Sequence, residues 1–131
     1  MKFFSNEWAQ QLKNTINANQ EYKNSSEGWK SSLILSMKNN GEEQFLFLDL
    51  DNGECKEIQI AAQDKLETAD FIINAGKETW RRILSGSLSP MQALMMKSLK
   101  IDKGNMSDLL PYINSLKELL NSAMKIETDF D

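Results

Sequence analysis

Apolar residues recur along the chain at two different spacings, and each spacing predicts a different element of structure. Trp8, Leu12 and Ile16 recur every four residues, which predicts an amphipathic helix with Ser5 as its N-terminal cap. The face opposite this stripe is polar, so the helix is expected to lie on a core with one side in water. The polar stretch from Glu21 to Gly28 that follows is expected to be a connection.

Three strands are predicted after this connection, and they are joined by two tight turns. From Trp29 to Met37 apolar and polar residues alternate, which predicts a strand with one covered side, Ile34 being the exception. The next strands are predicted at Phe45 to Leu50 and at Cys55 to Ile60. The turn pairs are Asn40-Gly41 and Asn52-Gly53. The pattern predicts an antiparallel meander.

The middle of the chain predicts a crossover followed by two strands with two short helices between them. Ala61 to Thr68 is too long for a hairpin and is expected to cross over with a helical turn. Asp70 to Ala75 predicts a strand covered on both faces. Lys77 to Leu84 and a segment that starts at Ser89 predict helices, the second with a capping box and a proline at its first position. Leu99 to Ile101 predicts a short strand.

The last predicted helix, Met106 to Met124, has the clearest helical period in the chain. Pro111 lies several residues inside it and lacks a backbone donor, so we expect the helix to start near Asp108 or to be kinked at Ser107. The tail from Glu127 to Asp131 is expected to be loose. Taken together, the elements predict an α+β domain over residues 1–131, with a five-stranded, mainly antiparallel sheet and helices packed on one face.

Composition narrows the functional classes. The chain has 131 residues, a formal net charge of -4 and no histidine. The charge argues against sequence-independent binding to nucleic acid or to anionic lipid, since both need a basic surface. The missing histidine removes the commonest general base and metal ligand. No apolar run approaches the roughly 20 residues of a membrane helix, and the N-terminus lacks the pattern of a signal peptide. With its single cysteine, Cys55, the chain is expected to be cytoplasmic.

Three reactive or charged features each have a simpler interpretation. The acidic loop that starts at Asp49 fails as a calcium loop, because Glu54 stands where glycine is needed and Ile60 where the bidentate glutamate belongs. Cys55 is expected to be structural. The cations could receive an anionic head group, but solvated side chains are the commoner role. These cations are Arg81, Arg82, Lys97, Lys100 and Lys103. We therefore expect no catalytic residue, no metal and no cofactor.

A family resemblance appears in the stretch from Trp80 to Asn105. The residues that carry it are Trp80, Ile83-Leu84, Gly86, Pro90, Ala93, Met95, Leu99-Lys100-Ile101 and Gly104-Asn105, together with Glu7 to Gln10 and Leu48 to Cys55. With these residues the chain resembles the SCP-2 (sterol carrier protein 2) sterol-transfer domain over nearly its whole length. The family usually has a Gly-Lys pair where this chain has Lys97-Ser98.

The resemblance implies an SCP2-like fold that encloses an apolar tunnel between the helices and the sheet. Methionine is flexible and suits surfaces that accept variable partners, and several methionines lie in or beside the last two predicted helices. On this basis the expected ligand-binding residues are Phe71, Ile73, Trp80, Ile83, Leu84, Met91, Leu94, Met95, Leu109, Ile113, Leu116 and Leu120.

The expected function is that of a non-catalytic lipid-binding or lipid-transfer protein, monomeric or weakly dimeric. Its expected partner is a fatty acid, a fatty acyl ester or a sterol-like lipid, without nucleic acid and without stable membrane insertion. The last helix is the expected gate of the tunnel. An alternative is an accessory protein-interaction module, dimeric in one version, that serves a lipid-pathway enzyme. A cofactor-free enzyme acting on a bound acyl group is the third hypothesis.

Overall fold

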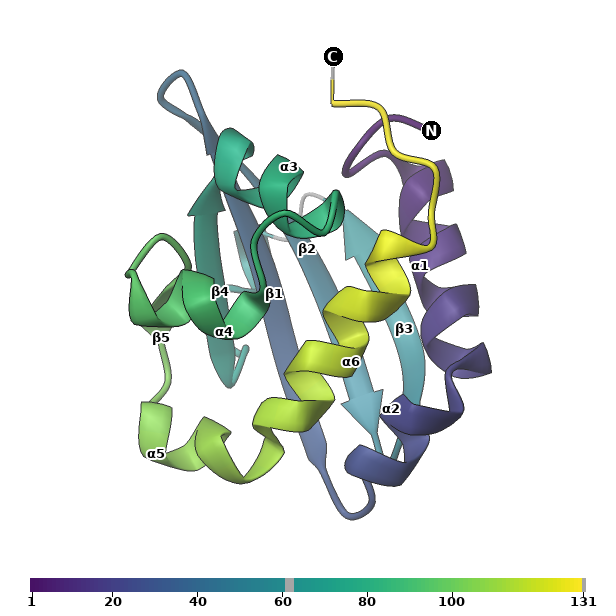
Figure 1. The fold of residues 1–131 in the computed structure, drawn as a ribbon. Helices are drawn as coiled ribbons and strands as arrows, with labels where there is room; N and C mark the ends of the chain where they lie inside the picture. Colours follow the sequence, from purple (N-terminus) through teal and green to yellow (C-terminus); the bar gives the residue numbers. More distant parts are fainter. Residues whose placement is uncertain (61–62, 131) are drawn as a thin grey trace.

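The computed structural model describes residues 1–60 and 63–130, which form one sheet covered by helices (Figure 1). The five strands lie in the order β3-β2-β1-β4-β5. They are β1 (Lys30–Asn39), β2 (Glu42–Asp51), β3 (Glu54–Ile60), β4 (Phe71–Gly76) and β5 (Lys100–Lys103). Neighbours are antiparallel except β1 and β4, which are parallel. The predicted α+β fold with a mainly antiparallel sheet is confirmed, and the β1–β4 pair makes the sheet mixed.

The helices gather on one face of the sheet, as predicted (Figure 1). They are α1 (Asn6–Ala18), α2 (Gln20–Ser25), α3 (Lys77–Leu84), α4 (Pro90–Met95), α5 (Met106–Leu109) and α6 (Ile113–Met124), with the short 3-10 helix η2 (Leu110–Tyr112) between the last two. A second 3-10 helix, η1 (Gln63–Lys65), lies in the crossover between β3 and β4. Ser5 caps α1 by accepting a hydrogen bond from the backbone N–H of Trp8 at 3.2 Å. The predicted capping box of α4 is also present, between Ser89 and Gln92.

The segment predicted as a connection from Glu21 to Gly28 contains the helix α2, so that prediction was wrong. Its cap is the side chain of Asn19, which accepts a hydrogen bond from the backbone N–H of Tyr22 at 3.1 Å. Tyr22 itself is fully buried. A six-residue helix with one apolar anchor has no periodic stripe, and packing and capping hold it in place of intrinsic propensity.

The long helix predicted from Met106 to Met124 is interrupted, and the interruption lies later than expected. Proline removes a backbone donor and clashes with the preceding turn, so the chain passes from α5 through η2, which contains Pro111, before α6 begins at Ile113. Tyr112, at the end of η2, has a non-helical backbone (φ -118°, ψ 22°). Its ring stacks on Trp29, with centroids 5.1 Å apart and planes 9° apart. The break therefore has its own anchor on the sheet.

The C-terminal tail is fixed to the N-terminus, which corrects the expectation that it is loose. The backbone N–H of Asp129 donates to the carbonyl of Met1 at 2.7 Å, and the N–H of Phe3 donates to the carbonyl of Asp129 at 2.9 Å. The indole N–H of Trp8 also donates to the hydroxyl of Thr128, at 2.9 Å. The two ends of the chain therefore hold each other, and Asp131 lies outside the described residues.

The sheet is covered on part of its second face as well. Ile34, Phe45, Phe47 and Ala69 form a small buried cluster there, separate from the main core under the helices. The segment that contains η1 supplies the helical turn predicted for the crossover, of which residues 61–62 lie outside the described residues. Ile34, the exception to the predicted alternation of the first strand, is therefore buried in this second cluster.

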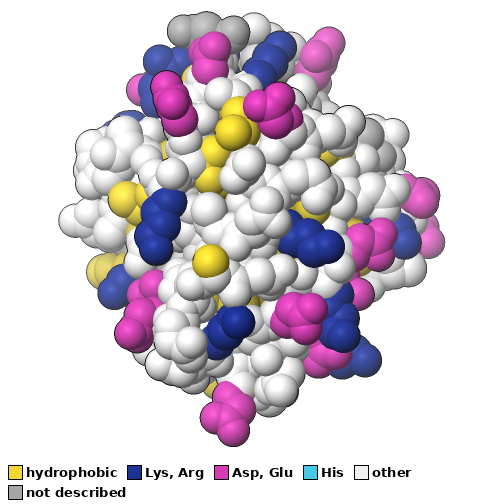
Figure 2. Space-filling model, turned by 90° about the vertical axis from the view of Figure 1, so that its right-hand side faces the viewer, with side chains coloured by type: hydrophobic (Ala, Val, Ile, Leu, Met, Phe, Trp, Pro, Cys, Tyr) yellow, Lys and Arg dark blue, Asp and Glu magenta, His cyan; other side chains and the backbone are white. Residues whose placement is uncertain are grey.

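Seen from the α1 side, the surface carries charges of both signs, and its apolar atoms form small separate spots (Figure 2). Such a mixture is ordinary for a protein surface and does not mark an interface. Within residues 1–60 and 63–130, no helix combines the length and the apolar character needed to cross a bilayer.

Candidate functional site

The twelve residues predicted to line a tunnel fall into three groups by exposure. Seven are buried: Phe71, Ile73, Trp80, Ile83, Leu109, Leu116 and Leu120. Three are half-buried: Leu84, Leu94 and Ile113. Two are exposed, Met91 at 42% and Met95 at 78%.

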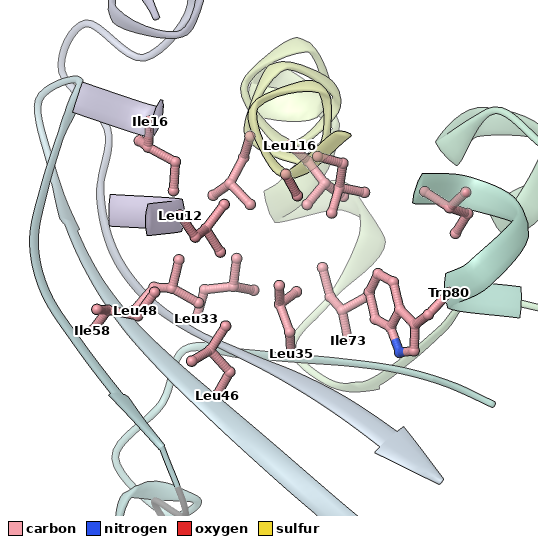
Figure 3. Packing of buried hydrophobic residues seen from close by; sticks show 14 of the residues in the cluster. Leu12, Ile16, Leu33, Leu35, Leu46, Leu48, Ile58, Ile73, Trp80 and Leu116 are labelled. Carbon is pink, nitrogen blue, oxygen red and sulfur yellow. The ribbon is translucent and has the colours of Figure 1, made fainter. Parts of the chain in front are cut away.

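The buried group meets between the sheet and the helices. Figure 3 shows side chains from β1, β2, β3 and β4 pointing toward those of α1, α3 and α6, with Ile73 and Trp80 near each other. The indole N–H of Trp80 donates to the carbonyl of Ser36 at 3.0 Å, which ties α3 to the centre of the sheet. None of the five best-formed hollows in the described part of the chain is lined by Trp80, Ile83 or Leu116. These three side chains instead belong to the main hydrophobic core between the layers.

The largest of these hollows is a groove of about 510 Å³ beside the edge strand β5. We call it the β5 groove; it is lined by Leu94, Lys97, Leu99, Lys100, Ile101, Asp102, Gly104, Asn105 and Met106. Leu99 is 1% exposed and belongs to the main core, so the apolar wall of the groove is continuous with the core. Small-molecule sites commonly have volumes of roughly 300–1,000 Å³. The groove is therefore large enough for part of a lipid.

Helix α4 forms one wall of this groove, and its local structure explains why its methionines face solvent. Pro90 and Ala93 are the residues that α4 buries. Met91 and Met95, which were expected in the site, lie on the exposed side of α4, because small residues pack closest to the neighbouring elements and direct the long side chains outward. Of the three α4 residues expected in the site, only Leu94 reaches the groove.

The end of α4 is closed by a residue in the left-handed conformation. Lys97 has φ +62°, and its N–H donates to the carbonyl of Leu94 at 3.1 Å. The N–H of Ser98 donates to the carbonyl of Ala93 at 3.0 Å. These two hydrogen bonds are the Schellman arrangement, in which glycine usually holds the left-handed position. Lys97 thus stands at a position that favours glycine, and its side chain lies at the rim of the β5 groove.

Two smaller hollows adjoin the β5 groove. One, of about 350 Å³, shares Gly104 and Asn105 with it and reaches Trp29 and Phe71. The other, of about 400 Å³, shares Lys97, Lys100 and Asp102 with it. We call this second one the polar hollow; its other lining residues are Lys38, Asn74, Ala75, Gly76 and Ser98. Hollow space therefore surrounds β5 on several sides.

The basic residues singled out in the sequence do not act as one cluster. The ammonium of Lys103 donates to the carbonyls of Leu66 and Glu67 at 3.1 and 2.6 Å. Arg81 forms an ion pair with Glu78 at 3.5 Å and lies over the ring of Phe130. Lys97 and Lys100 line both the β5 groove and the polar hollow. These two lysines give the site its positive rim.

The part of the chain that the structure describes offers no organised nucleophile or metal site. Burial raises the pKa of the Cys55 thiol to about 12, so the thiol is protonated at neutral pH. The described residues contain no group of three or more aspartate, glutamate, histidine or cysteine side chains that could hold a metal ion. The acidic loop forms the turn between β2 and β3, with Asn52 and Gly53 both at positive φ.

The sequence and the fold match a known family. The family model of the SCP-2 sterol transfer family matches residues 9–117. The chain belongs to this family. Its members bind or transfer lipids, which fits an apolar groove better than it fits a catalytic site. Among curated proteins, no relative was found.

Several solved structures are similar to this chain. A crystal structure of sterol carrier protein 2 is 29% identical, covers 96% of this chain and 100% of its own, and has a TM-score of 0.87. A conserved hypothetical protein from Thermus thermophilus, described as a possible sterol carrier protein, is also 29% identical, with 98% and 92% coverage and a TM-score of 0.84. Palmitated SCP2L2 from Aedes aegypti shares the fold at 18% identity, with 86% and 93% coverage and a TM-score of 0.60.

Sequence reasoning missed several residues of the hollows in this SCP-2 domain. Leu99, Ile101 and Met106 were assigned to a strand or a helix but were not expected in the site. Lys38 and Asn74 were placed in or beside strands but were not expected in a site either. One signal was available for Asn74, because it is a single polar residue within an otherwise apolar strand, and buried polar groups call for a partner.

Proposed function

We propose that the protein is a non-catalytic lipid carrier that holds one fatty acid, fatty acyl ester or sterol-like lipid. The observation that carries this proposal is the β5 groove of about 510 Å³, whose apolar wall joins the core through Leu94, Leu99 and Ile101. Membership of the SCP-2 sterol transfer family supports it. No cofactor is needed, because burial of an apolar chain supplies the binding energy.

The energetics suit a chain that lies partly in the groove. Each CH₂ removed from water contributes about 0.8 kcal/mol, so ten such groups contribute on the order of 8 kcal/mol. Association and ordering cost at least several kcal/mol. A few more groups inserted between the layers would therefore be required for micromolar affinity, which corresponds to about 8 kcal/mol net. The proposal includes such insertion, toward the buried residues of the predicted tunnel.

The interruption around Pro111 is the proposed gate. Residues 106–112 are divided between two short helices, and Leu110 is 53% exposed although Leu109 beside it is fully buried. Short helices are weakly held by their own hydrogen bonds. Moving this segment outward would uncover Leu109 and extend the β5 groove into the core. The stack of Tyr112 on Trp29 would open in the same step.

The chain offers few groups that could act as a catalytic base or nucleophile. The sequence contains no histidine, and the thiol of Cys55 is buried and protonated at neutral pH. We propose that the carrier works in the cytoplasm, because a reducing compartment keeps a single cysteine as a free thiol.

The test is a titration with palmitic acid and with a sterol, monitored by tryptophan fluorescence and native mass spectrometry. Two matched variants, Met106→Glu and Met124→Glu, locate the site. Met106 lines the β5 groove and is 41% exposed, whereas Met124 lies outside this groove and is 38% exposed. We expect M106E to weaken palmitate binding about five-fold or more, since it replaces apolar wall with charge. We expect M124E to bind as the parent does.

Failure of this proposal has a clear signature. A flat fluorescence response and no lipid adduct at micromolar ligand would overturn the carrier function. Equal weakening by M106E and M124E would move the binding site away from the β5 groove. The chain has three tryptophans, so Trp29→Phe identifies the source of the signal. A fluorescence change that Trp29→Phe abolishes would support the gate, because Trp29 stacks on the segment that must move.

A second candidate is a protein-interaction module, which the surface of α4 favours. Met91, Met95 and Met96 are 42%, 78% and 62% exposed, and methionine suits surfaces that accept variable partners. In this hypothesis a second copy of the chain, or an enzyme of lipid metabolism, covers α4. Size-exclusion chromatography with mass measurement separates the candidates. A stable dimer that Met95→Lys dissociates would favour the module, and a monomer at all concentrations would remove the dimeric version.

A further inference from the structure

An unpartnered amide lies in the wall of the polar hollow. Asn74, in β4, is 5% exposed, yet its side-chain oxygen has no hydrogen-bond partner among the described residues. A buried carbonyl without a donor costs roughly 1–3 kcal/mol, so native structures rarely leave one in place without a purpose. Asn74 lines the polar hollow, which has a volume of about 400 Å³. The hollow can therefore hold a group that donates a hydrogen bond to this oxygen.

Positive charge surrounds the same hollow. Lys38, Lys97 and Lys100 line it, and the carboxylate of Asp102 is the only acidic group among its described lining residues. Glu43 stands opposite Lys38 in the register of β1 and β2. Three cations against two carboxylates leave a local charge of about +1, although the whole chain carries -4. One negative charge would balance this region.

The polar hollow continues into the apolar groove. Lys97, Lys100 and Asp102 belong to the lining of both, so a ligand that spans them would have its chain against Leu94 and its head near Asn74. Lys97 holds its place although φ +62° disfavours every residue except glycine. A strained residue at such a position often marks a site. Here its cation stands at the junction of the two hollows.

We propose that the head-group site of this carrier accepts a single-chain glycerophospholipid, whose head has one phosphate charge and a free hydroxyl. The inference rests on the proposed function, because the chain of the lipid occupies the β5 groove. A fatty acid supplies the negative charge but no hydrogen-bond donor at neutral pH, so it leaves Asn74 unpartnered. A neutral monoglyceride supplies the donor but no charge. A lysophospholipid with a hydroxyl-bearing head supplies both.

The test compares three probes with the same acyl chain, each below its micelle-forming concentration. They are palmitoyl lysophosphatidylglycerol, palmitic acid and monopalmitin. We expect the parent protein to bind the lysophosphatidylglycerol about five- to ten-fold more tightly than palmitic acid, because it gains the hydrogen bond to Asn74. We expect it to bind about two- to five-fold more tightly than monopalmitin, because it gains the ion pair. Calorimetry or native mass spectrometry measures the three dissociation constants.

Variants assign the two parts of the head group separately. Asn74→Ala should weaken binding of lysophosphatidylglycerol about five-fold, because it removes the acceptor, and should affect palmitic acid far less. Lys97→Gly should weaken both anionic probes about two- to five-fold and leave monopalmitin nearly unchanged. Lys117→Ala, an exposed change on α6 outside the hollows, is the control. Asn74→Ser replaces N74A if that variant fails to fold.

The outcomes separate the two proposals. Equal affinity for all three probes, or unaltered lysophosphatidylglycerol binding by both N74A and K97G, overturns the head-group inference. In that case palmitate binding that responds to M106E still upholds the carrier function. Binding of none of the probes overturns both. The expected pattern, with N74A and K97G acting on different probes, cannot arise from a general loss of folding.

Discussion

The two edges of the sheet are built in opposite ways. At one edge α1 lies along β3 (Figure 1). There the side-chain amide of Asn17 makes two hydrogen bonds with the backbone of Cys55. The N–H of Cys55 donates to Asn17 at 2.8 Å, and its carbonyl accepts from Asn17 at 3.1 Å. At the other edge β5 has four residues, alternately exposed and half-buried, with three hollows around it.

This difference assigns stability and binding to different parts of one sheet. Unpaired strand edges invite unwanted pairing, and proteins usually cover them. The β3 edge is covered by a side chain that imitates a neighbouring strand. The β5 edge lies beside a short helix, α4, and the interrupted segment 106–112, which we propose moves when a ligand enters. The apolar site proposed above lies where the sheet is least covered.

The largest expected effect concerns the covered edge at high pH. Burial raises the pKa of Cys55 from 9.0 to about 12 and that of Tyr22 from 10.0 to about 12. Both groups are neutral in the native protein over this range, whereas the unfolded chain loses its protons from pH 9 upward. The free energy of unfolding is therefore unaffected below pH 9 and falls as the pH rises toward 12, by on the order of 4 kcal/mol from Cys55 alone.

Urea unfolding at pH 8, 9, 10 and 11 measures this fall. Cys55→Ala is the informative variant, because it removes the earlier of the two titrations and leaves that of Tyr22. We expect a smaller loss of stability between pH 9 and 11 for C55A than for the parent, whatever its stability at pH 8. Equal losses would show that the thiol is not held neutral by the covered edge.

The next effect tests whether the β5 edge is loosely built throughout. Gly104, directly after β5, has φ +97°, and a Cβ there would approach the carbonyl oxygen of Asp70 to 2.9 Å and would also meet the ring of Phe71. We expect Gly104→Ala to cost about 3 kcal/mol, from backbone strain and overpacking together. Gly41 has φ +84° with nothing within 4 Å, so Gly41→Ala should cost only about 1 kcal/mol. Denaturant midpoints of the two variants give the comparison.

If both glycine variants lose the same amount, the close approach at Gly104 is relieved by movement of Phe71. That result would mean that the open edge adapts even at its tightest contact. A larger loss of stability for G104A than for G41A would mean that the adaptable part of the β5 edge is limited to α4 and residues 105–112. The difference between the β5 edge and the β3 edge would then be more sharply located.

The third effect removes the cover of the β3 edge. Asn17→Ala leaves the N–H and the carbonyl of Cys55 without their partners, and we expect a loss of about 2 kcal/mol. Asn14→Ala, on an exposed face of the same helix, should change the stability by less than about 0.5 kcal/mol. Thermal and urea unfolding give both values. A loss for N17A no greater than for N14A would mean that water replaces the amide at the edge strand without cost.

The sequence predicted the covered half of this molecule better than the open half. The period of Trp8, Leu12 and Ile16 and the two Asn-Gly turns are local signals, and each produced the structure it predicted. Alternation could not show that β1 pairs in parallel with β4, because pairing depends on partners far apart in the chain. The prediction of a loose tail from Glu127 failed for the same reason, because the partners of the tail lie at the N-terminus, far away in the chain.

For the candidate site, the sequence did not indicate which way the side chains of the predicted elements point. Apolar residues in α4 predicted a helix correctly but not which side it buries, because a six-residue helix has too few positions to fix its phase. The hollows form where two short elements meet an edge strand, a property of the assembled surface. Lys97 and Asn74 became informative only when the backbone conformation of one and the burial of the other were known.

The smallest expected effect returns to the open edge and has the opposite sign. At φ +62°, Lys97 bears the strain of the left-handed conformation in the Schellman closure of α4. Lys97→Gly should therefore raise the free energy of unfolding by about 1 kcal/mol. Lys97→Ala keeps the strain and removes the charge, so it should leave the stability nearly unchanged. Urea unfolding separates the two, and a gain shared by K97A would trace the effect to the charge. A gain confined to K97G would show that the open edge keeps a less stable residue at the rim of its groove, as expected where the ammonium is needed for a ligand.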